Sequence, residues 1–273
     1  MERFGGYGTP RTARGRSQAY GPPPWHLAGR ALALWFRLAD PAEARRHVPP
    51  LLEMADDPIV RARFWDLAHD SGTPDARGAG RPLPTRVAEA VVAFPVTYQG
   101  VSGDFTVHMY ADDPVYTAFG REVMGWPLRP GRIVVSQAPL AAGLQTGVNI
   151  AGHLERDDRV LMSAALTLTE LLPDGERPTG LPRWLTQKLV PSADGNGDAV
   201  RQLVQTGPER AEWGPIWRAK GELRFADGPN DELGFLAPRE IVAAQYWSEV
   251  DISVGYGRIL LDEGNRGGSD DGR

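Results

Sequence analysis

The residue with the clearest capacity for chemistry is Glu89, a carboxylate set among valines in the segment 87–98. Alternation along a strand places Val87, Glu89 and Val91 on one face. If that face points inward, desolvation draws the carboxyl group towards its neutral form, which suits a general acid or base. Two other arrangements fit the same pattern, namely an ion pair between Glu89 and an arginine, or a glutamate that faces solvent.

Amine and imidazole groups are scarce, which limits other routes to catalysis. Thirty residues are lysine or arginine, and only Lys188 and Lys220 are lysines, so a side-chain amine nucleophile must be one of these two. His108 has two interpretations, a proton shuttle or a structurally satisfied histidine. The five histidines lack the spacing of a zinc site and the chain has no cysteine, so we predict no metal centre.

Composition is that of an ordinary globular protein acting on small molecules. The chain has 273 residues, of which 41% are hydrophobic, and a net charge of −5, which argues against a nucleic-acid partner. No apolar run approaches the roughly 18 residues that span a bilayer, and no signal-peptide core is visible. We therefore expect a cytoplasmic protein with a small-molecule substrate and no membrane partner. Nucleotide-binding and Gly-x-Ser-x-Gly motifs are absent, and we predict no cofactor.

Short strands and few helices dominate the predicted secondary structure. Two helices begin at the N-cap and proline pairs Asp40–Pro41 and Asp113–Pro114, and the second covers about 114–124. Strand-like patterns occupy 31–36, 59–68, 87–98, 103–110, 148–154, 160–168, 203–204, 217–225 and 242–254, with a hairpin turn at 155–159. In the segment 103–110, alternation places Thr106, His108 and Tyr110 on one face. The pattern predicts a β-rich α+β fold with mainly antiparallel strands.

We expect one domain over residues 21–262. The stretches 1–20 and 263–273 are rich in glycine with arginine or other polar residues. Such segments cannot bury enough apolar surface to offset their conformational entropy, and we predict two disordered tails.

The segment from Gly120 to Arg129 closes a helix and turns through Pro127 into a strand. It resembles the signature of the acetoacetate decarboxylase family, which reads Gly-Arg-Glu, several residues, an aromatic residue, proline and two lysines. The chain matches this signature up to the proline and then has Leu128 and Arg129 in place of the two lysines. Similar blocks at 57–61, 69–72, 94–100, 103–113 and 184–195 extend the resemblance over about residues 20–262.

The resemblance implies a cone-shaped, largely antiparallel β-barrel with a few short helices, an interior pocket and association into a homo-oligomer. It also implies roles for individual positions. An arginine near the substrate in the family falls on Arg30, an essential glutamate on Glu89 and the pocket aromatic on Trp126. A second acidic position falls on Arg63, which reverses its charge, and the Schiff-base lysine falls on Leu128.

This departure at Leu128 disfavours the family's covalent chemistry. Leucine has no nucleophile, and Arg129 stays protonated and forms no imine. Leu128, Trp126 and Met124 then predict either a pocket for a larger, more apolar ligand or simple core packing. Arg129 has two interpretations, an oxyanion contact or a surface arginine.

Our leading hypothesis is a lyase or isomerase, a dehydratase or cyclase that works without a Schiff base on a carbonyl-bearing apolar intermediate such as a polyketide of secondary metabolism. In this hypothesis Glu89 moves a proton, Arg30 and Arg129 hold negative charge, and Trp126, Leu128, Met124, His108 and Arg63 contact the substrate. Two alternatives stay open. One is decarboxylation through Lys188 or Lys220, and the other is a non-catalytic small-molecule binder.

Overall fold

The computed structural model describes residues 12–14, 19–71, 85–136 and 143–264. Its helical segments are short: α1 (Pro41–Arg45), α2 (Pro114–Phe119), the π-helical turn η1 (Gly120–Met124), and the 3-10 turns η2 (Asp174–Glu176) and η3 (Gly234–Leu236). The strands are β1 (Trp25–Leu38), β2 (Val60–Ser71), β3 (Thr85–Tyr98), β4 (Val101–Ala111), β5 (Leu128–Pro130), β6 (Arg132–Val135), β7 (Asn149–Arg156), β8 (Arg159–Leu171), β9 (Trp184–Pro191), β10 (Asp198–Thr206), β11 (Pro208–Trp213), β12 (Ile216–Phe225), β13 (Pro238–Val254) and β14 (Arg258–Asp262).

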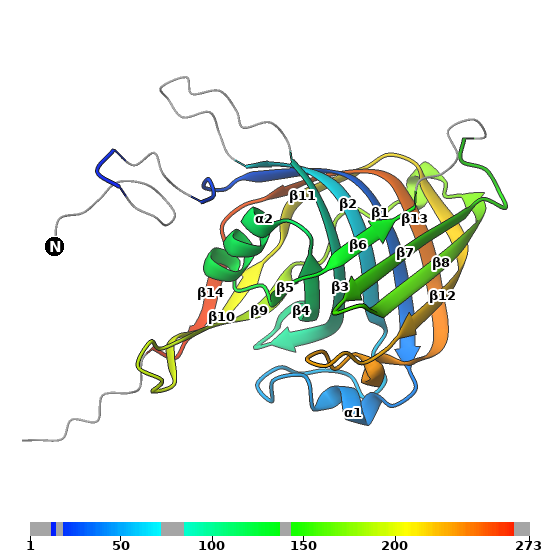
Figure 1. Ribbon diagram of the computed structural model, residues 1–273. Coiled ribbons are helices and arrows are strands. Elements are labelled where there is room, and N and C mark those ends of the chain that lie inside the picture. The colour runs from blue at the N-terminus through cyan, green and yellow to red at the C-terminus, as the bar shows by residue number, and fades with distance from the viewer. Residues whose placement is uncertain (1–11, 15–18, 72–84, 137–142, 265–273) are drawn as a thin grey trace, which may run out of the picture.

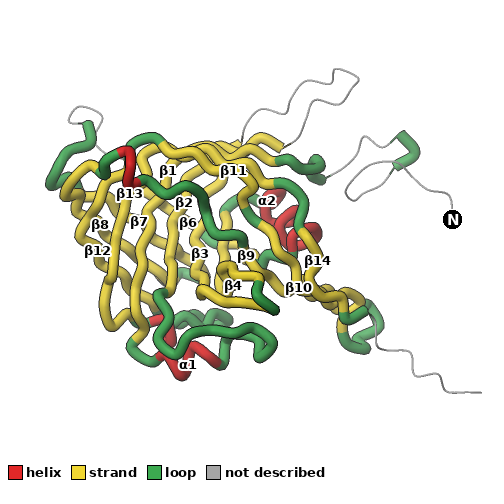
Figure 2. Tube along the Cα trace, turned by 180° about the vertical axis from the view of Figure 1, so that it is seen from behind, coloured by secondary structure: helices red, strands yellow, loops and turns green. Residues whose placement is uncertain are grey.

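All these strands belong to one sheet, with the order β14-β10-β9-β4-β3-β2-β1-β13-β12-β8-β7-β6 and with β11 and β5 attached to β13 and β4. Every pairing is antiparallel except β4 with β5 and β4 with β9. The sheet curls until β6 lies against β2 and β3 (Figure 1). Strands β9, β10 and β14 extend it on the other side of β4 (Figure 2). The predicted β-rich, mainly antiparallel barrel is confirmed.

Both helix starts follow from their capping residues. The Asp40 carboxylate accepts a hydrogen bond from the Glu43 backbone N–H at 3.0 Å, and Asp113 accepts one from the Tyr116 N–H at 2.6 Å. Each aspartate precedes a proline at the first helical position, where its missing N–H costs nothing. Gly125 ends η1 with a φ of 71°, a left-handed conformation that glycine adopts without strain.

Two apolar cores lie on opposite faces of β1 to β4. The first fills the space between these strands and the β6–β8 wall, and it includes Phe64, Ala90 and Tyr110. The second lies under α2 and η1, and it includes Trp65, Val91 and the signature residues Met124, Trp126 and Leu128. Successive residues of β2 and β3 therefore alternate between two buried environments.

The predicted shared face holds for His108 and Tyr110 but is wrong for Thr106. The pairing of β3 with β4 shifts between Val92 and Ala93, so that β4 carries an extra residue there. Phe105 and Tyr110 consequently both belong to the first core, although strict alternation would separate them. Thr106, next to Phe105, faces the second core.

The predicted tails fall mostly outside the described residues. At the inner end of the first tail, Tyr20 is buried and its hydroxyl donates a hydrogen bond to Glu122. Within the described ranges, no helix is both long and apolar enough to span a bilayer. The single domain over 21–262 stays a prediction.

Candidate functional site

Glu89 lies in the second core and is only 2% exposed. Its strand neighbours on the same face, Val87 and Val91, are buried with it. The Tyr116 hydroxyl, on α2, donates a hydrogen bond to Glu89 Oε2 at 2.8 Å. Helix α2 therefore closes over the carboxyl group and supplies its hydrogen-bond donor.

A buried cation stands beside this carboxyl group. Arg63 of β2 pairs with Val91 of β3, and Trp65 pairs with Glu89, so Arg63 is a diagonal neighbour of Glu89 on the same face. Arg63 is 3% exposed, and its guanidinium carbon lies 5.8 Å from the centroid of the Trp247 ring. Burial and the charge of Arg61 lower the pKa of Arg63 to about 9, against a raising effect of Glu89. Arg63 is therefore still mainly charged at neutral pH.

Burial controls the titration of Glu89. Desolvation raises the pKa of Glu89 to about 7, although the hydrogen bond from Tyr116 and the charge of Arg63 act in the opposite direction. A group with a pKa near the working pH is present in both its acid and base forms, which is the condition for efficient proton transfer. The neighbouring Tyr116 hydroxyl has its pKa raised well above the usual value by burial and by Glu89, and it stays a donor.

Several buried polar atoms on this face have no hydrogen-bond partner among the described residues. They are Arg63 Nε, Trp65 Nε1, Asp104 Oδ2 and Thr106 Oγ1. Buried donors and acceptors are nearly always paired in native proteins, so a cluster of unpaired groups calls for an explanation such as a catalytic role, an ordered water or an ion. We call Arg63, Trp65, Glu89 and Tyr116 the Glu89 cluster.

The signature segment packs against the same face. Pairing across β2, β3, β4 and β5 aligns Arg63, Val91, Met109 and Leu128 in one row. Leu128 is fully buried, and a Cβ on Gly120 would lie 2.3 Å from its Cδ1 atom. The glycine of the signature is therefore required for Leu128 to approach η1 closely.

Trp126 and Met124 complete this wall of the second core. Trp126 Nε1 donates a hydrogen bond to Thr206 Oγ1 at 2.8 Å, and its ring lies 5.6 Å from that of Tyr116. Met124 is fully buried, and its carbonyl accepts a hydrogen bond from Thr186. All three predicted apolar site residues thus lie in the core that holds Glu89.

Neither lysine belongs to the Glu89 cluster. Lys188 is half-buried at the edge of η1, where Nζ donates to the Val123 carbonyl at 3.4 Å. Burial lowers the pKa of Lys188, while the charge of Glu122 opposes the shift. Lys220 is exposed on β12.

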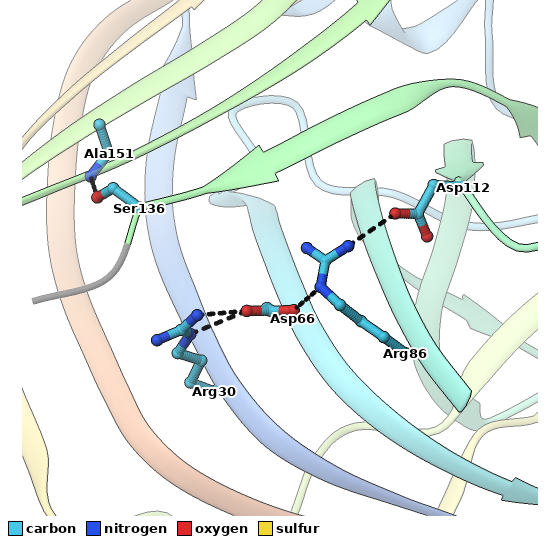
Figure 3. Close-up of polar contacts among 6 residues, drawn as sticks. All are labelled: Arg30, Asp66, Arg86, Asp112, Ser136 and Ala151. Atoms are coloured by element: carbon cyan, nitrogen blue, oxygen red, sulfur yellow. Dashed lines mark hydrogen bonds and ion pairs between the residues drawn. The ribbon is translucent and has the colours of Figure 1, made fainter. Parts of the chain in front are cut away.

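Arg30 lies on the opposite face of the sheet, away from Glu89. Arg30 pairs with Asp66 of β2, the residue after Trp65, and successive strand residues point to opposite faces. Its guanidinium forms an ion pair with Asp66, which also binds Arg86 at 2.7 Å (Figure 3). Arg86 reaches Asp112 at 3.1 Å, so these four side chains form one charged chain. Arg30 is therefore not the arginine that pairs with Glu89.

Arg129 and His108 also point away from the Glu89 cluster. Arg129 is 40% exposed and binds Asp231 at 2.8 Å, and Asp231 also accepts the Tyr110 hydroxyl at 2.7 Å. His108 is 7% exposed and its ring stacks near that of Tyr110 in the first core. Of Arg30, Arg63 and Arg129, only Arg63 is a neighbour of Glu89.

His108 should make the fold sensitive to acid. Desolvation, with the charges of Arg129 and His47, lowers the pKa of His108 to about 4, and a bond to the Glu232 backbone and the charge of Asp231 oppose this only in part. The unfolded chain therefore binds more protons between its pKa of about 6.5 and the folded value, and stability falls as the pH drops through this range. We expect His108 to account for a loss of about 2–4 kcal/mol by pH 4.

The measurement is urea unfolding at several pH values for the wild type and His108→Phe. The difference in unfolding free energy between the two proteins should change with pH below 6.5, because other titrating groups cancel in it. His26→Asn, at an exposed histidine, is the matched control and should show no such change. A constant difference for His108→Phe would contradict the prediction.

Comparison with known proteins identifies the family of this chain. The family model described as acetoacetate decarboxylase matches residues 8–263. The chain belongs to the acetoacetate decarboxylase family. Acetoacetate decarboxylase of Ralstonia nicotianae is 28% identical over 250 residues, covering 90% of this chain and 92% of the relative. That of Chromobacterium violaceum is 27% identical with the same coverage of both chains.

Solved structures place the fold in the same group. The enduracididine biosynthesis enzyme MppR, complexed with pyruvate, matches with a TM-score of 0.80 and 25% identity, covering 96% of this chain and 99% of its own. An acetoacetate decarboxylase-like enzyme from Sphingomonas wittichii RW1 has a TM-score of 0.80 at 20% identity, covering 94% of this chain and all of its own. This chain has Leu128 and Arg129 at the two positions for which the resemblance to the family signature implies lysines.

Sequence reasoning missed four residues around Glu89. Trp65 and Tyr116 could have been found from the spacing of their elements, since only two residues separate β4 from the helix whose first turn holds Tyr116. The ion pair between Arg61 and Asp104 could not be predicted from the sequence, because it depends on how β2, β3 and β4 pair. Among the described residues, no group of histidines and carboxylates has the arrangement of a metal site.

Proposed function

We propose that this protein catalyses proton transfer next to a carbonyl group without a covalent amine intermediate, as a dehydratase or cyclase of a small carbonyl compound. The observation that carries the proposal is a buried carboxyl group with a pKa near 7, bonded to Tyr116 and facing the cation of Arg63. Glu89 is the general base and acid, and Arg63 takes the role that we first gave to Arg30.

The first step is removal of a proton. The Glu89 carboxylate takes a proton from the carbon next to the carbonyl, and the electron pair of that C–H bond moves to the carbonyl oxygen. The resulting enolate is negatively charged, and Arg63 and the indole N–H of Trp65 are the buried donors that would stabilise it. Buried donors that already point at the developing charge need no reorganisation, which is the main source of their effect.

The second step returns the proton. Where a hydroxyl group is attached one carbon further along, the enolate electron pair forms a double bond and the C–O bond breaks. Hydroxide leaves and takes the proton from Glu89, giving water and the original carboxylate. Where a second carbonyl of the same molecule lies in reach, the enolate carbon adds to it instead, and Glu89 protonates the new alkoxide.

The walls of the second core support a substrate that carries apolar groups. The Trp126 ring lies 5.6 Å from that of Tyr116 and the Trp247 ring 5.4 Å from that of Trp65, and Leu128, in the same core, is apolar where the family resemblance implies a lysine. Each Å² of apolar surface removed from water contributes about 25 cal/mol to binding. The enduracididine biosynthesis enzyme MppR has been solved with pyruvate, a 2-oxo acid, and this supports a carbonyl compound with a carboxylate as the substrate class here. A polyketide-type intermediate and a homo-oligomeric assembly stay predictions.

Decarboxylation through a lysine is the second candidate, because curated relatives are acetoacetate decarboxylases and burial lowers the pKa of Lys188. The Nζ of Lys188 is engaged by the Val123 carbonyl, and this lysine does not belong to the Glu89 cluster. A non-catalytic binder would keep the buried donors without turnover, and the exchange experiment below separates it from an enzyme.

The test combines deuterium exchange with borohydride trapping. We expect the wild-type protein in D₂O to exchange the methyl protons of pyruvate or 2-oxobutyrate at least tenfold faster than buffer, as followed by NMR. Sodium borohydride added with either compound, or with acetoacetate, should leave the protein mass unchanged because no imine forms. A covalent adduct on Lys188 would support the decarboxylase instead, and binding without exchange would support the binder.

A further inference from the structure

An open pocket of about 580 Å³ lies at the ends of β3 and β4, and no residue of the Glu89 cluster lines it. Its floor is formed by two cross-strand pairs, Pro95 with Asp104 and Thr97 with Ser102. These residues alternate along their strands and therefore face one side of the sheet. The hydroxyl groups of Thr97 and Ser102 lie 3.2 Å apart and share a hydrogen bond.

Backbone hydrogen bonds place a charged residue on each side of this floor. Glu53 and Thr97 exchange two of them, of 2.8 and 2.9 Å, so Glu53 extends the sheet beyond β3. On the other side, the Asp104 N–H donates to the Arg183 carbonyl at 2.9 Å, so Arg183 lies beyond β4. Neighbouring strands are about 4.8 Å apart, and three such spacings separate the two main chains by about 14 Å.

The four charged side chains of the pocket balance one another, but only two of them are paired. Arg61 forms an ion pair with the fully buried Asp104. Glu53 is exposed, and its carboxylate has no ion-pair or hydrogen-bond partner within the described ranges. Arg183 Nη1 donates to the Pro208 carbonyl at 3.3 Å, and Nη2 has no acceptor in the part of the chain that the structure describes. One carboxylate and one guanidinium are therefore available to a ligand.

The spacing of these two groups determines the shape of ligand that can reach both. Side chains stand roughly perpendicular to a sheet, so the charges of Glu53 and Arg183 stay apart across the floor. Apolar surface adjoins both ends, because Met54 follows Glu53 and Pro182 precedes Arg183, and Pro95 lies on the floor. A ligand that contacts both ends therefore carries its charges at the two ends of a carbon chain.

We propose that this pocket binds an ω-amino carboxylate, a zwitterion whose ammonium group contacts Glu53 and whose carboxylate contacts Arg183. A guanidinium is well suited to a carboxylate, and the ammonium group completes the charge complementarity at the other end. A plain anion would leave Glu53 unpaired, and a plain cation would leave Arg183 unpaired. The site is separate from the Glu89 cluster, and the inference goes beyond the proposed function without depending on it.

The test is isothermal titration calorimetry with 4-aminobutyrate, 5-aminopentanoate and 6-aminohexanoate. Each is compared with the straight-chain acid and the straight-chain amine of the same number of carbon atoms. At the length that bridges the floor, the ω-amino carboxylate should bind at least about tenfold more tightly than the amine, which lacks the charge-assisted contact with Arg183. Its advantage over the acid should be about two- to fivefold, because an ion pair with an exposed carboxylate such as Glu53 contributes less.

Two variants assign these preferences to the two ends of the pocket. Arg183→Gln should reduce the preference over the amine to less than twofold and keep the preference over the acid, whereas Glu53→Gln should do the reverse. Because each variant keeps one preference, a general loss of folding cannot produce this result. Arg224→Gln, at an exposed arginine outside the pocket, is the matched control and should keep both preferences.

Two results would overturn the inference. One is equal affinity for the zwitterion, the acid and the amine at every chain length. The other is a preference over the amine that is undiminished in Arg183→Gln. Neither result bears on the proposed function, because the deuterium exchange of a 2-oxo acid by the Glu89 cluster is measured separately and with a different ligand.

Discussion

Replacing Glu89 with glutamine should reduce the deuterium exchange of a bound 2-oxo acid by about 10²- to 10⁴-fold, the usual contribution of a positioned acid or base. Glutamine has the shape of the protonated glutamate and still accepts the hydrogen bond from Tyr116, so the second core should keep its packing. Pyruvate affinity should change only a few-fold, because Arg63 and Trp65 stay in place. Exchange is read by NMR and affinity by calorimetry.

Although Glu89→Gln should lose exchange activity, it should gain stability at high pH. The pKa of Glu89 is raised to about 7 by burial, so the folded protein holds a proton that the unfolded chain releases near pH 4.5, and wild-type stability falls as the pH rises between these values. Glu89→Gln lacks this penalty and should be more stable than the wild type at pH 8 by about 2–3 kcal/mol. Glu222→Gln, at an exposed carboxylate, should change neither exchange nor stability. Exchange within threefold of the wild type would remove Glu89 from the mechanism.

Much of the fold was predictable because its signals are local. Asp40–Pro41 and Asp113–Pro114 mark both helix starts, and alternation in 87–98 marks β3. Alternation alone does not say which face is solvent, and here both faces of β3 are buried, so Glu89 could not be placed from its strand. The bulge in β4 was invisible for a related reason, since an extra residue is defined only against its partner strand.

The candidate site was predictable only in part, because it depends on which face of the sheet each side chain occupies and on the register between neighbouring strands. Arg30 and Glu89 were both implied by family resemblance, yet Arg30 faces the first core and pairs with Asp66. Arg63 looked like a lost acidic residue, whereas its place in the β2 register puts its charge next to Glu89. Long-range pairing decides such neighbours, and a single sequence carries little information about it.

Installing a lysine at Leu128 should destabilise the protein by several kcal/mol, the second large effect that we expect. Leu128 is fully buried and lies so close to Gly120 that a Cβ there would be 2.3 Å from its Cδ1 atom, so a longer side chain overpacks this wall. The introduced ammonium would also lose its hydration, and its pKa would fall by up to about 3–5 units. Because the folded protein would then bind fewer protons than the unfolded chain, the stability of Leu128→Lys should rise with pH towards the normal lysine pKa.

Leu128→Met is the matched control, since it keeps the volume and apolar character and should cost less than about 1.5 kcal/mol at every pH. Urea unfolding at neutral and alkaline pH measures both variants. If Leu128→Lys is as stable as the wild type, the wall formed by Leu128 is less tightly packed than the distances to Gly120 indicate. Borohydride trapping of Leu128→Lys tests whether the introduced amine can form an imine with a ketone. A lysine kept neutral on the face that carries Glu89 has the free amine that imine formation needs. A trapped adduct in Leu128→Lys, absent from the wild type and from Leu128→Met, would show that position 128 alone separates this chain from covalent catalysis.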